Sequence, residues 1–111
     1  MSSELRDVPV ACDPQALTAE VWAEHQATTA QLFGALREAT EELDDGYAFR
    51  FPAASLALVA AFIERERRCC PFFTFHLIIP PAGAALTLRI TGSPEAKGVL
   101  TTELLKPTLL P

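Results

Sequence analysis

The sequence predicts an α+β fold, in which helices cover one face of a four-stranded antiparallel sheet. Short segments with strand-like alternation of apolar residues occur in two pairs, and a glycine-containing turn joins the members of each pair. Longer segments with apolar residues at helical spacing precede, separate and follow these pairs. Because strands joined by short turns run antiparallel, the expected order is α-β-β-α-β-β-α, with two hairpins.

The first half of the chain contains the signals of a helix and a hairpin. Asp13 before a proline is typical of a helix start, and Thr18 is placed to cap a longer amphipathic helix. That helix should run for about five turns. Residues 40–43 and 47–51 are the expected strands, and an Asp-Gly pair between them suits a hairpin turn.

The second half repeats the pattern. A more apolar helix is expected over residues 54–69, and strands are expected over residues 72–79 and 85–90 with a Pro-Pro-Ala-Gly turn between them. Ser93, which precedes a proline, should cap a last helix that ends before Pro107.

Length and composition are those of one domain. The chain has 111 residues, of which 50% are hydrophobic, so residues 1–111 can form a single core without structural metals or disulfides. Residues 1–7 and 108–111 are expected to be frayed. The sequence has no solenoid-length repeat and no low-complexity linker.

The charge and hydropathy pattern argues against nucleic-acid binding, a signal peptide and a membrane span. A formal charge of −5 argues against nucleic-acid binding, which requires a basic face. The first ten residues contain no apolar run typical of a signal peptide, and no segment approaches the roughly 18 apolar residues that span a membrane. A cytoplasmic location is therefore expected. In a reducing compartment, the three cysteines should be thiols or metal ligands.

The two adjacent cysteines stand where helix gives way to strand. Pro71 disfavours helical geometry at Cys70, so the helix should end at Cys69 or Cys70. We expect at least one of these sulfurs to be reachable from solvent or from a small cavity. Thiolates select soft ions, and Arg68 is the nearby cation best placed to tune them.

Other side chains are candidates to complete a metal site. Cys12 precedes a helix start, and if it folds against the Cys69–Cys70 corner, three sulfurs could form a trigonal site. The alternative is that all three cysteines are small buried hydrophobic residues. His76, on a strand, is a secondary metal ligand, whereas His25, on the apolar side of the first long helix, is interpreted as a core or boundary histidine.

Three segments resemble a family of small, uncharacterised bacterial proteins: residues 9–13 (PVACD), 43–49 (LDDGYAF) and 64–72 (ERERRCCPF). The last contains the Glu-Arg-x-x-Arg-Cys-Cys-Pro-Phe type of motif, and the resemblance covers most of the chain. This family is associated with heavy-metal resistance neighbourhoods, mercury especially. The resemblance implies that Cys69 and Cys70, with Cys12, bind a thiophilic metal ion, which would be the cofactor of the protein.

These observations lead to one main functional hypothesis and two alternatives. The main hypothesis is a cytoplasmic thiol-based binding protein for a soft metal or metalloid ion, acting as a buffer, carrier or accessory of heavy-metal resistance. The first alternative is a small dimeric interaction module with structural cysteines. The second is a thiol redox or detoxifying enzyme, for which only His76 is close enough in sequence to act as a general base. No catalytic residue is assigned, and an enzyme is the less favoured class.

Overall fold

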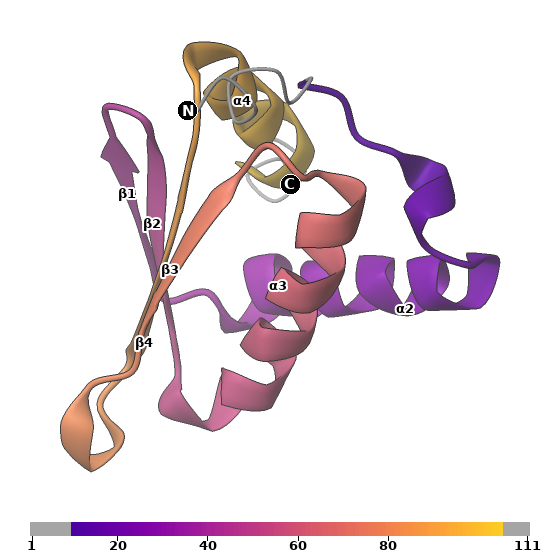
Figure 1. The fold of residues 1–111 in the computed structure, drawn as a ribbon. Helices are drawn as coiled ribbons and strands as arrows, with labels where there is room; N and C mark the ends of the chain where they lie inside the picture. Colours follow the sequence, from indigo (N-terminus) through magenta and orange to yellow (C-terminus); the bar gives the residue numbers. More distant parts are fainter. Residues whose placement is uncertain (1–9, 106–111) are drawn as a thin grey trace, which may run out of the picture.

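The computed structural model describes residues 10–105, so the fraying expected for residues 1–7 and 108–111 lies outside the described residues. The order is α-β-β-α-β-β-α, and the three helices pack on one face of a four-stranded antiparallel sheet (Figure 1). This architecture confirms the predicted fold class. Within the described part of the chain, no helix has the length and apolar character needed to cross a bilayer.

The helices begin where the sequence placed their caps. A 3-10 turn, Pro14–Ala16, follows Asp13, whose carboxylate accepts a hydrogen bond from the Gln15 amide. The Thr18 hydroxyl caps α2 (Ala19–Ala30) by accepting from the amide of Val21, and a π-helical segment (Gln31–Leu36) prolongs that helix.

The other two helices follow the two hairpins. A 3-10 turn leads into α3 (Leu56–Cys69), which is slightly shorter than the predicted 54–69. The Ser93 hydroxyl caps α4 (Pro94–Leu100), and a π-helical segment continues to Leu105. Local capping chemistry therefore located every helix start that it predicted.

The sheet has the order β1-β2-β4-β3, so the two hairpins meet through their second strands. Phe49 in β2 faces Leu88 in β4, and Leu88 faces Leu77 in β3, which places apolar side chains in one row across the helix-covered face. The predicted strand 72–79 is shorter than expected, because pairing begins only at Thr74. The four strands are β1 (Ala39–Leu43), β2 (Gly46–Phe51), β3 (Thr74–Ile78) and β4 (Leu86–Thr91).

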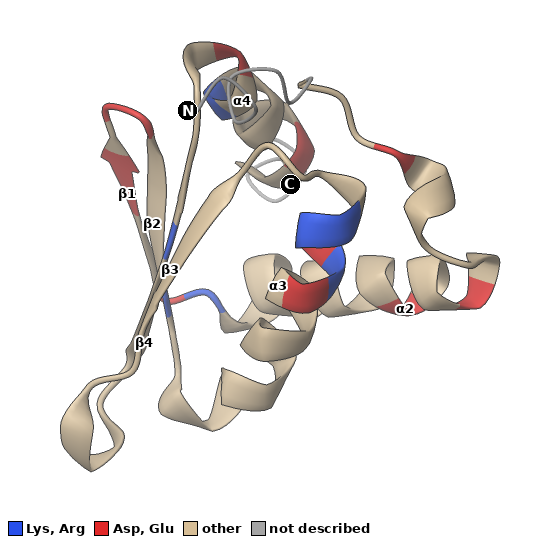
Figure 2. Cartoon of the chain, viewed as in Figure 1, with Lys and Arg blue, Asp and Glu red and all other residues tan. Residues whose placement is uncertain are grey.

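The other sheet face is solvated. Arg50 and Arg89 are exposed, and Arg89 faces the exposed His76 on the neighbouring edge strand. Figure 2 shows that charged residues also gather on the last turns of α3 and that the turn between β1 and β2 is acidic. The exposed charged residues on the strands agree with a sheet that buries only one face.

The core lies between the sheet and the helices, and aromatic rings dominate it. Phe33 makes edge-to-face contacts with Phe49, Phe51 and Phe62, at centroid distances of 4.9–5.4 Å. The fully buried large side chains come from the sheet and from all three helical regions: Phe33, Phe49, Phe51, Phe62, Leu32, Leu86, Leu88, Ile90, Leu100, Val59 and Cys69.

Some expected core positions are only partly buried. The helical spacing of apolar residues predicts Ile63 on the inner side of α3, but Phe62 is fully buried and Ile63 lies at the edge of the core. Phe73 and Phe75 are also half-buried, because β3 is an edge strand, and Trp22 lies half-buried on α2. The prediction was wrong at Ile63, because either of two adjacent helical residues can fit an apolar stripe and packing selects between them.

Candidate functional site

The three sulfurs meet at the carboxyl end of α3. Cys12 and Cys70 form a disulfide across a sequence separation of 58 residues, with their Cα atoms 4.4 Å apart. The amide of Asp13 donates to the carbonyl of Cys69 over 2.6 Å, which ties the N-terminal segment to the end of the helix. The expected approach of Cys12 to the Cys69–Cys70 corner is therefore confirmed.

The end of α3 explains why Cys70, and not Cys69, is bonded to Cys12. The helix ends at Cys69, as Pro71 requires, and Cys70 has the non-helical angles φ −128° and ψ 76°. The side chain of Cys70 is thus released from the helical direction and meets Cys12. The expectation that the three cysteines are thiols or metal ligands is wrong for this pair, because folding brings two sulfurs that are distant in sequence within bonding range.

Cys69 keeps its thiol and is buried. Its Sγ atom lies 3.8 Å from Sγ of Cys70 and 3.6 Å from the carbonyl oxygen of Glu66. Burial, and secondly the negative charge of Glu66, raise the pKa of the Cys69 thiol from 9.0 to about 11. The positive charge of Arg68 acts in the opposite direction but more weakly, and Arg68 itself pairs with Glu64 at 3.0 Å.

The expected accessible sulfur is not found in the adjacent pair. Cys69 is 1% exposed and Cys70 is 5% exposed, whereas the residue Cys12 is exposed. Solvent therefore reaches this corner at Cys12. The amide of Asp13, bonded to the carbonyl of Cys69, holds the segment around Cys12 at the end of α3, beside the two buried cysteines.

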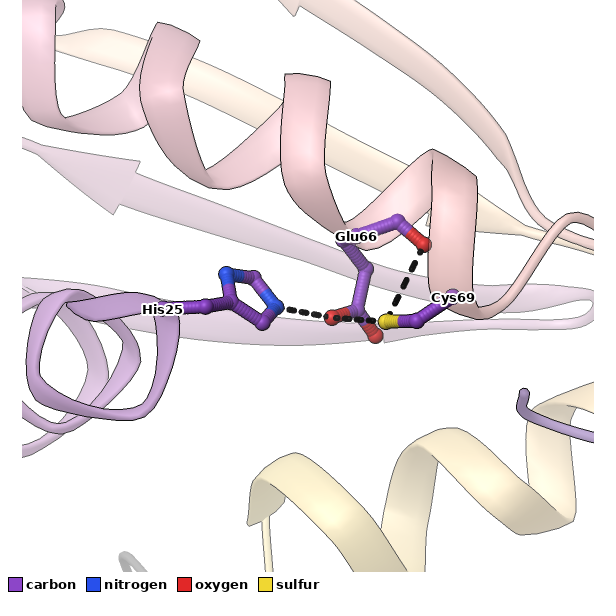
Figure 3. A group of neighbouring side chains, drawn as sticks. All are labelled: His25, Glu66 and Cys69. Atoms are coloured by element: carbon purple, nitrogen blue, oxygen red, sulfur yellow. Dashed lines mark hydrogen bonds and ion pairs between the residues drawn. The ribbon is translucent and has the colours of Figure 1, made fainter. Parts of the chain in front are cut away.

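A buried polar group adjoins the sulfur cluster (Figure 3). His25 on α2 donates from Nε2 to Oε1 of Glu66 on α3 over 2.7 Å, and Sγ of Cys69 lies 3.9 Å from the same carboxylate oxygen. One ligand atom from each of these three residues lies within 4.8 Å of the other two. The three side chains thus offer nitrogen, oxygen and sulfur donors around one point.

Aromatic contacts fix the ring of His25. Its ring stacks on Phe62 at a centroid distance of 5.5 Å and lies 5.9 Å from the ring of Trp22. Nδ1 of His25 is buried and is one of two such side-chain polar atoms without a hydrogen-bond partner in the described part of the chain. The structure confirms that His25 is a core histidine, with a single polar partner.

Sequence reasoning found the sulfurs but missed Glu66. Its place among charged residues at the end of a helix predicts a solvated side chain, yet Glu66 is 7% exposed. Its position three residues before Cys69 was the available signal, because residues at i and i+3 share a helix face. His76, the secondary ligand candidate, is exposed on β3, and among the described residues the group of neighbouring ligands contains His25, Glu66 and Cys69 without it.

Comparisons with family models, with curated proteins and with solved structures find no match to this chain. The fold and the site therefore define the protein only as an α+β domain with a three-sulfur corner and an adjoining buried His-Glu pair. The association of the Cys-Cys-Pro-Phe motif with heavy-metal resistance stays an expectation.

Proposed function

We propose that this protein binds one thiophilic metal or metalloid ion through Cys12, Cys69 and Cys70 when the Cys12–Cys70 disulfide is reduced. The observation that supports this proposal is the meeting of the three sulfurs, which come from opposite parts of the sequence, at one helix end. Adjacent cysteines alone offer two donors, and the segment that carries Cys12 supplies the third.

The distances within the cluster suit a trigonal sulfur site. Metal–sulfur bonds of about 2.3 Å place the sulfurs of a trigonal site about 4 Å apart. The Sγ atoms of Cys69 and Cys70 are already 3.8 Å apart. Cys12 needs only to move from its bonded position at Cys70 to a similar separation, and its segment stays anchored by the amide of Asp13.

Binding requires a defined reduction step. A dithiol reductant supplies two electrons and two protons to the disulfide, is itself oxidised to a disulfide, and leaves Cys12 and Cys70 as thiols. The ion then replaces the protons of the three thiols. Because Cys12 is exposed, its sulfur is the accessible point of attack for the reductant. The family resemblance suggests a role as buffer, carrier or resistance accessory.

The proposal is tested by mercury(II) titration of reduced and disulfide-closed protein under anaerobic conditions, after the reductant has been removed. Reduced protein should bind one equivalent with a sulfur-to-mercury charge-transfer absorption, and the closed protein should bind far more weakly. The double variant Cys69→Ser/Cys70→Ser should lose this absorption, whereas His76→Asn, which changes an exposed histidine on β3, should keep it. Unchanged absorption in the double variant would contradict the proposal.

The disulfide also gives support to the alternative of structural cysteines. The bond holds the segment around Cys12 against α3, which is a stabilising role that needs no ligand. Under this alternative, reduced protein binds no stoichiometric mercury(II).

The enzyme alternative gains a base in the His25–Glu66 pair, but Cys69 is 1% exposed, which gives an external substrate little access.

A further inference from the structure

We infer that His25, Glu66 and Cys69 form a divalent-metal site for a borderline cation such as zinc or cobalt(II), and that this site is complete while the Cys12–Cys70 disulfide is closed. The inference goes beyond the proposed function, because none of its three ligands belongs to the disulfide. Cys69 is common to both sites, so the two kinds of ion should compete for it.

Two of the three donor separations are close to those of a tetrahedral site, and all three are within 4.8 Å. Bonds of about 2.0–2.3 Å place the donor atoms of a tetrahedral zinc site about 3.3–3.5 Å apart. The Glu66 oxygen lies 3.9 Å from Sγ of Cys69 and 2.7 Å from Nε2 of His25. An ion that replaces the hydrogen bond between His25 and Glu66 would lengthen the nitrogen–oxygen separation and shorten the oxygen–sulfur separation, each by several tenths of an ångström.

The chemistry of the three donors balances the charge of the ion. A thiolate and a carboxylate together carry two negative charges, and a neutral imidazole carries none. A divalent cation bound by Cys69, Glu66 and His25 therefore leaves the buried group without net charge, which avoids the large cost of an uncompensated charge in the interior. Two carboxylates or two imidazoles with one thiolate would not give this balance.

The ligands are held by two packed helices. Glu66 and Cys69 lie on one face of α3, and His25 reaches them from α2 (Figure 3). The ring of His25 stacks on Phe62 and lies 5.9 Å from the ring of Trp22. The unpartnered Nδ1 atom shows that the protein does not satisfy all the polar capacity of this ring, although the residue is 2% exposed. When Nε2 binds the ion, the single proton of the neutral ring moves to Nδ1.

The donor set determines which ion is preferred. Imidazole and carboxylate suit zinc and cobalt(II), and one thiolate adds to their affinity, whereas mercury favours a site made of several sulfurs. Three protein ligands leave one tetrahedral position for water, or for Sγ of Cys70 once the disulfide is reduced, since that atom lies 3.8 Å from Sγ of Cys69.

The test uses the full chain with its disulfide closed, verified by mass spectrometry, and cobalt(II) followed by zinc as probes. Cobalt(II) should produce the intense visible bands of tetrahedral geometry with one thiolate-to-cobalt absorption at one equivalent, and zinc should remove both. X-ray absorption of the zinc-loaded wild-type protein should find one sulfur and otherwise nitrogen or oxygen neighbours. This measurement needs no variant, so it stays decisive if a buried substitution prevents folding.

Variants separate this inference from the proposed function. His25→Asn should lower cobalt(II) affinity of the closed protein by at least about tenfold, while its reduced form keeps the mercury(II) absorption. Glu66→Gln should do the same, and His76→Asn is the matched histidine control. Circular dichroism and thermal unfolding check that each variant is folded.

Two results would overturn the inference. The first is a disulfide-closed protein that binds no stoichiometric cobalt(II) or zinc, even though its reduced form binds mercury(II). The second is a zinc neighbour shell without sulfur, which would place the ion at exposed carboxylates. Failure of mercury(II) binding in the reduced protein contradicts only the proposed function.

Discussion

The side chains of His25 and Glu66 are 41 positions apart in the sequence and meet at 2.7 Å in the interior, where they are 3% and 10% exposed. This contact joins α2 to α3 beside the one cysteine that is not in the disulfide. On the surface, Arg65 and Glu24 join the same two helices at 3.4 Å. The two pairs join the same helices but differ in burial and in length, so the surface pair serves as a control for the buried one.

The first prediction concerns these two pairs. His25→Leu should lower the free energy of unfolding by about 3 kcal/mol, because it leaves the Glu66 carboxylate buried without its partner. The double variant His25→Leu/Glu66→Leu should recover part of this loss. Glu24→Ala, the surface control, should cost less than about 1 kcal/mol. Urea unfolding of the disulfide-closed proteins, with Glu66→Leu as the second single variant, measures all four, and strictly additive effects of the two buried substitutions would show that the pair is not coupled.

The second prediction concerns the disulfide. Cys12→Ser should lower the free energy of unfolding by about 2–4 kcal/mol, because the Cys12–Cys70 bond closes a long loop in the unfolded chain. The sequence separation of 58 residues puts the expected effect toward the upper part of that range. Wild-type protein in reductant should unfold at the same urea concentration as Cys12→Ser. A reduced wild type as stable as the oxidised one would contradict this account.

The third prediction concerns the ionisation of Cys69, the single thiol among the three cysteines of the closed protein. Because burial and Glu66 raise its pKa to about 11, thiolate absorbance should rise with a midpoint near that value, against 9.0 for an ordinary cysteine. The difference spectrum between wild type and Cys69→Ser removes the contribution of Tyr47. A midpoint near that of an ordinary cysteine would show that the thiol is solvated.

The same shift predicts how stability depends on pH. The folded-state pKa of Cys69 lies above its unfolded-state value, so the folded chain holds this proton more tightly. The stabilisation is fully present below pH 9.0 and is lost as pH rises toward about 11. Urea unfolding across this window should show a smaller decline in Cys69→Ser than in the wild type.

The fourth prediction tests the inner face of α3. Phe62→Ala should cost about 3–5 kcal/mol, because this ring is fully buried against Phe33. Ile63→Ala should cost clearly less, since Ile63 lies only at the edge of the core. Chemical unfolding of both variants ranks them. The reverse order would mean that Ile63, as the apolar periodicity predicts, faces the core instead of Phe62.

The fifth prediction compares two glycines. A Cβ atom at Gly46 would overlap the carbonyl of Ile90, because β2 and β4 approach closely there, so Gly46→Ala should destabilise the fold and broaden the resonances of both strands. Gly98 lies in α4 with open space around it, and Gly98→Ala should stabilise the protein by about 0.5–1 kcal/mol. Thermal unfolding and amide spectra of the two variants measure these opposite effects.

The sequence by itself determined the local structure. Asp13, Thr18 and Ser93 cap the helices that they were predicted to start, and Pro71 ends α3 where it was expected to. The two hairpins were also predicted, because turn residues act over a few neighbouring positions. Each of these features depends on backbone geometry and hydrogen bonds within about one turn of the chain.

Packing decided between options that local patterns left open. The apolar stripe of the second long helix was compatible with either Ile63 or Phe62 facing inward, and contact with Phe33 selected Phe62. The meeting of the two hairpins through β2 and β4 depends on long-range pairing, which turn chemistry does not specify. The edge position of β3, and with it the partial exposure of Phe75, follows from that pairing.

The composition of the site shows the same division. Sequence analysis named Cys12, Cys69 and Cys70 as one group, but it did not identify which two form a bond, nor Glu66 as their neighbour. The disulfide joins positions 58 residues apart, and the bond that holds Glu66 to His25 joins positions 41 residues apart. Only the docking of α2 and the N-terminal segment against α3 brings these residues together. Burial in a shared interior, and not residue type, excludes water, so buried polar groups form hydrogen bonds with one another.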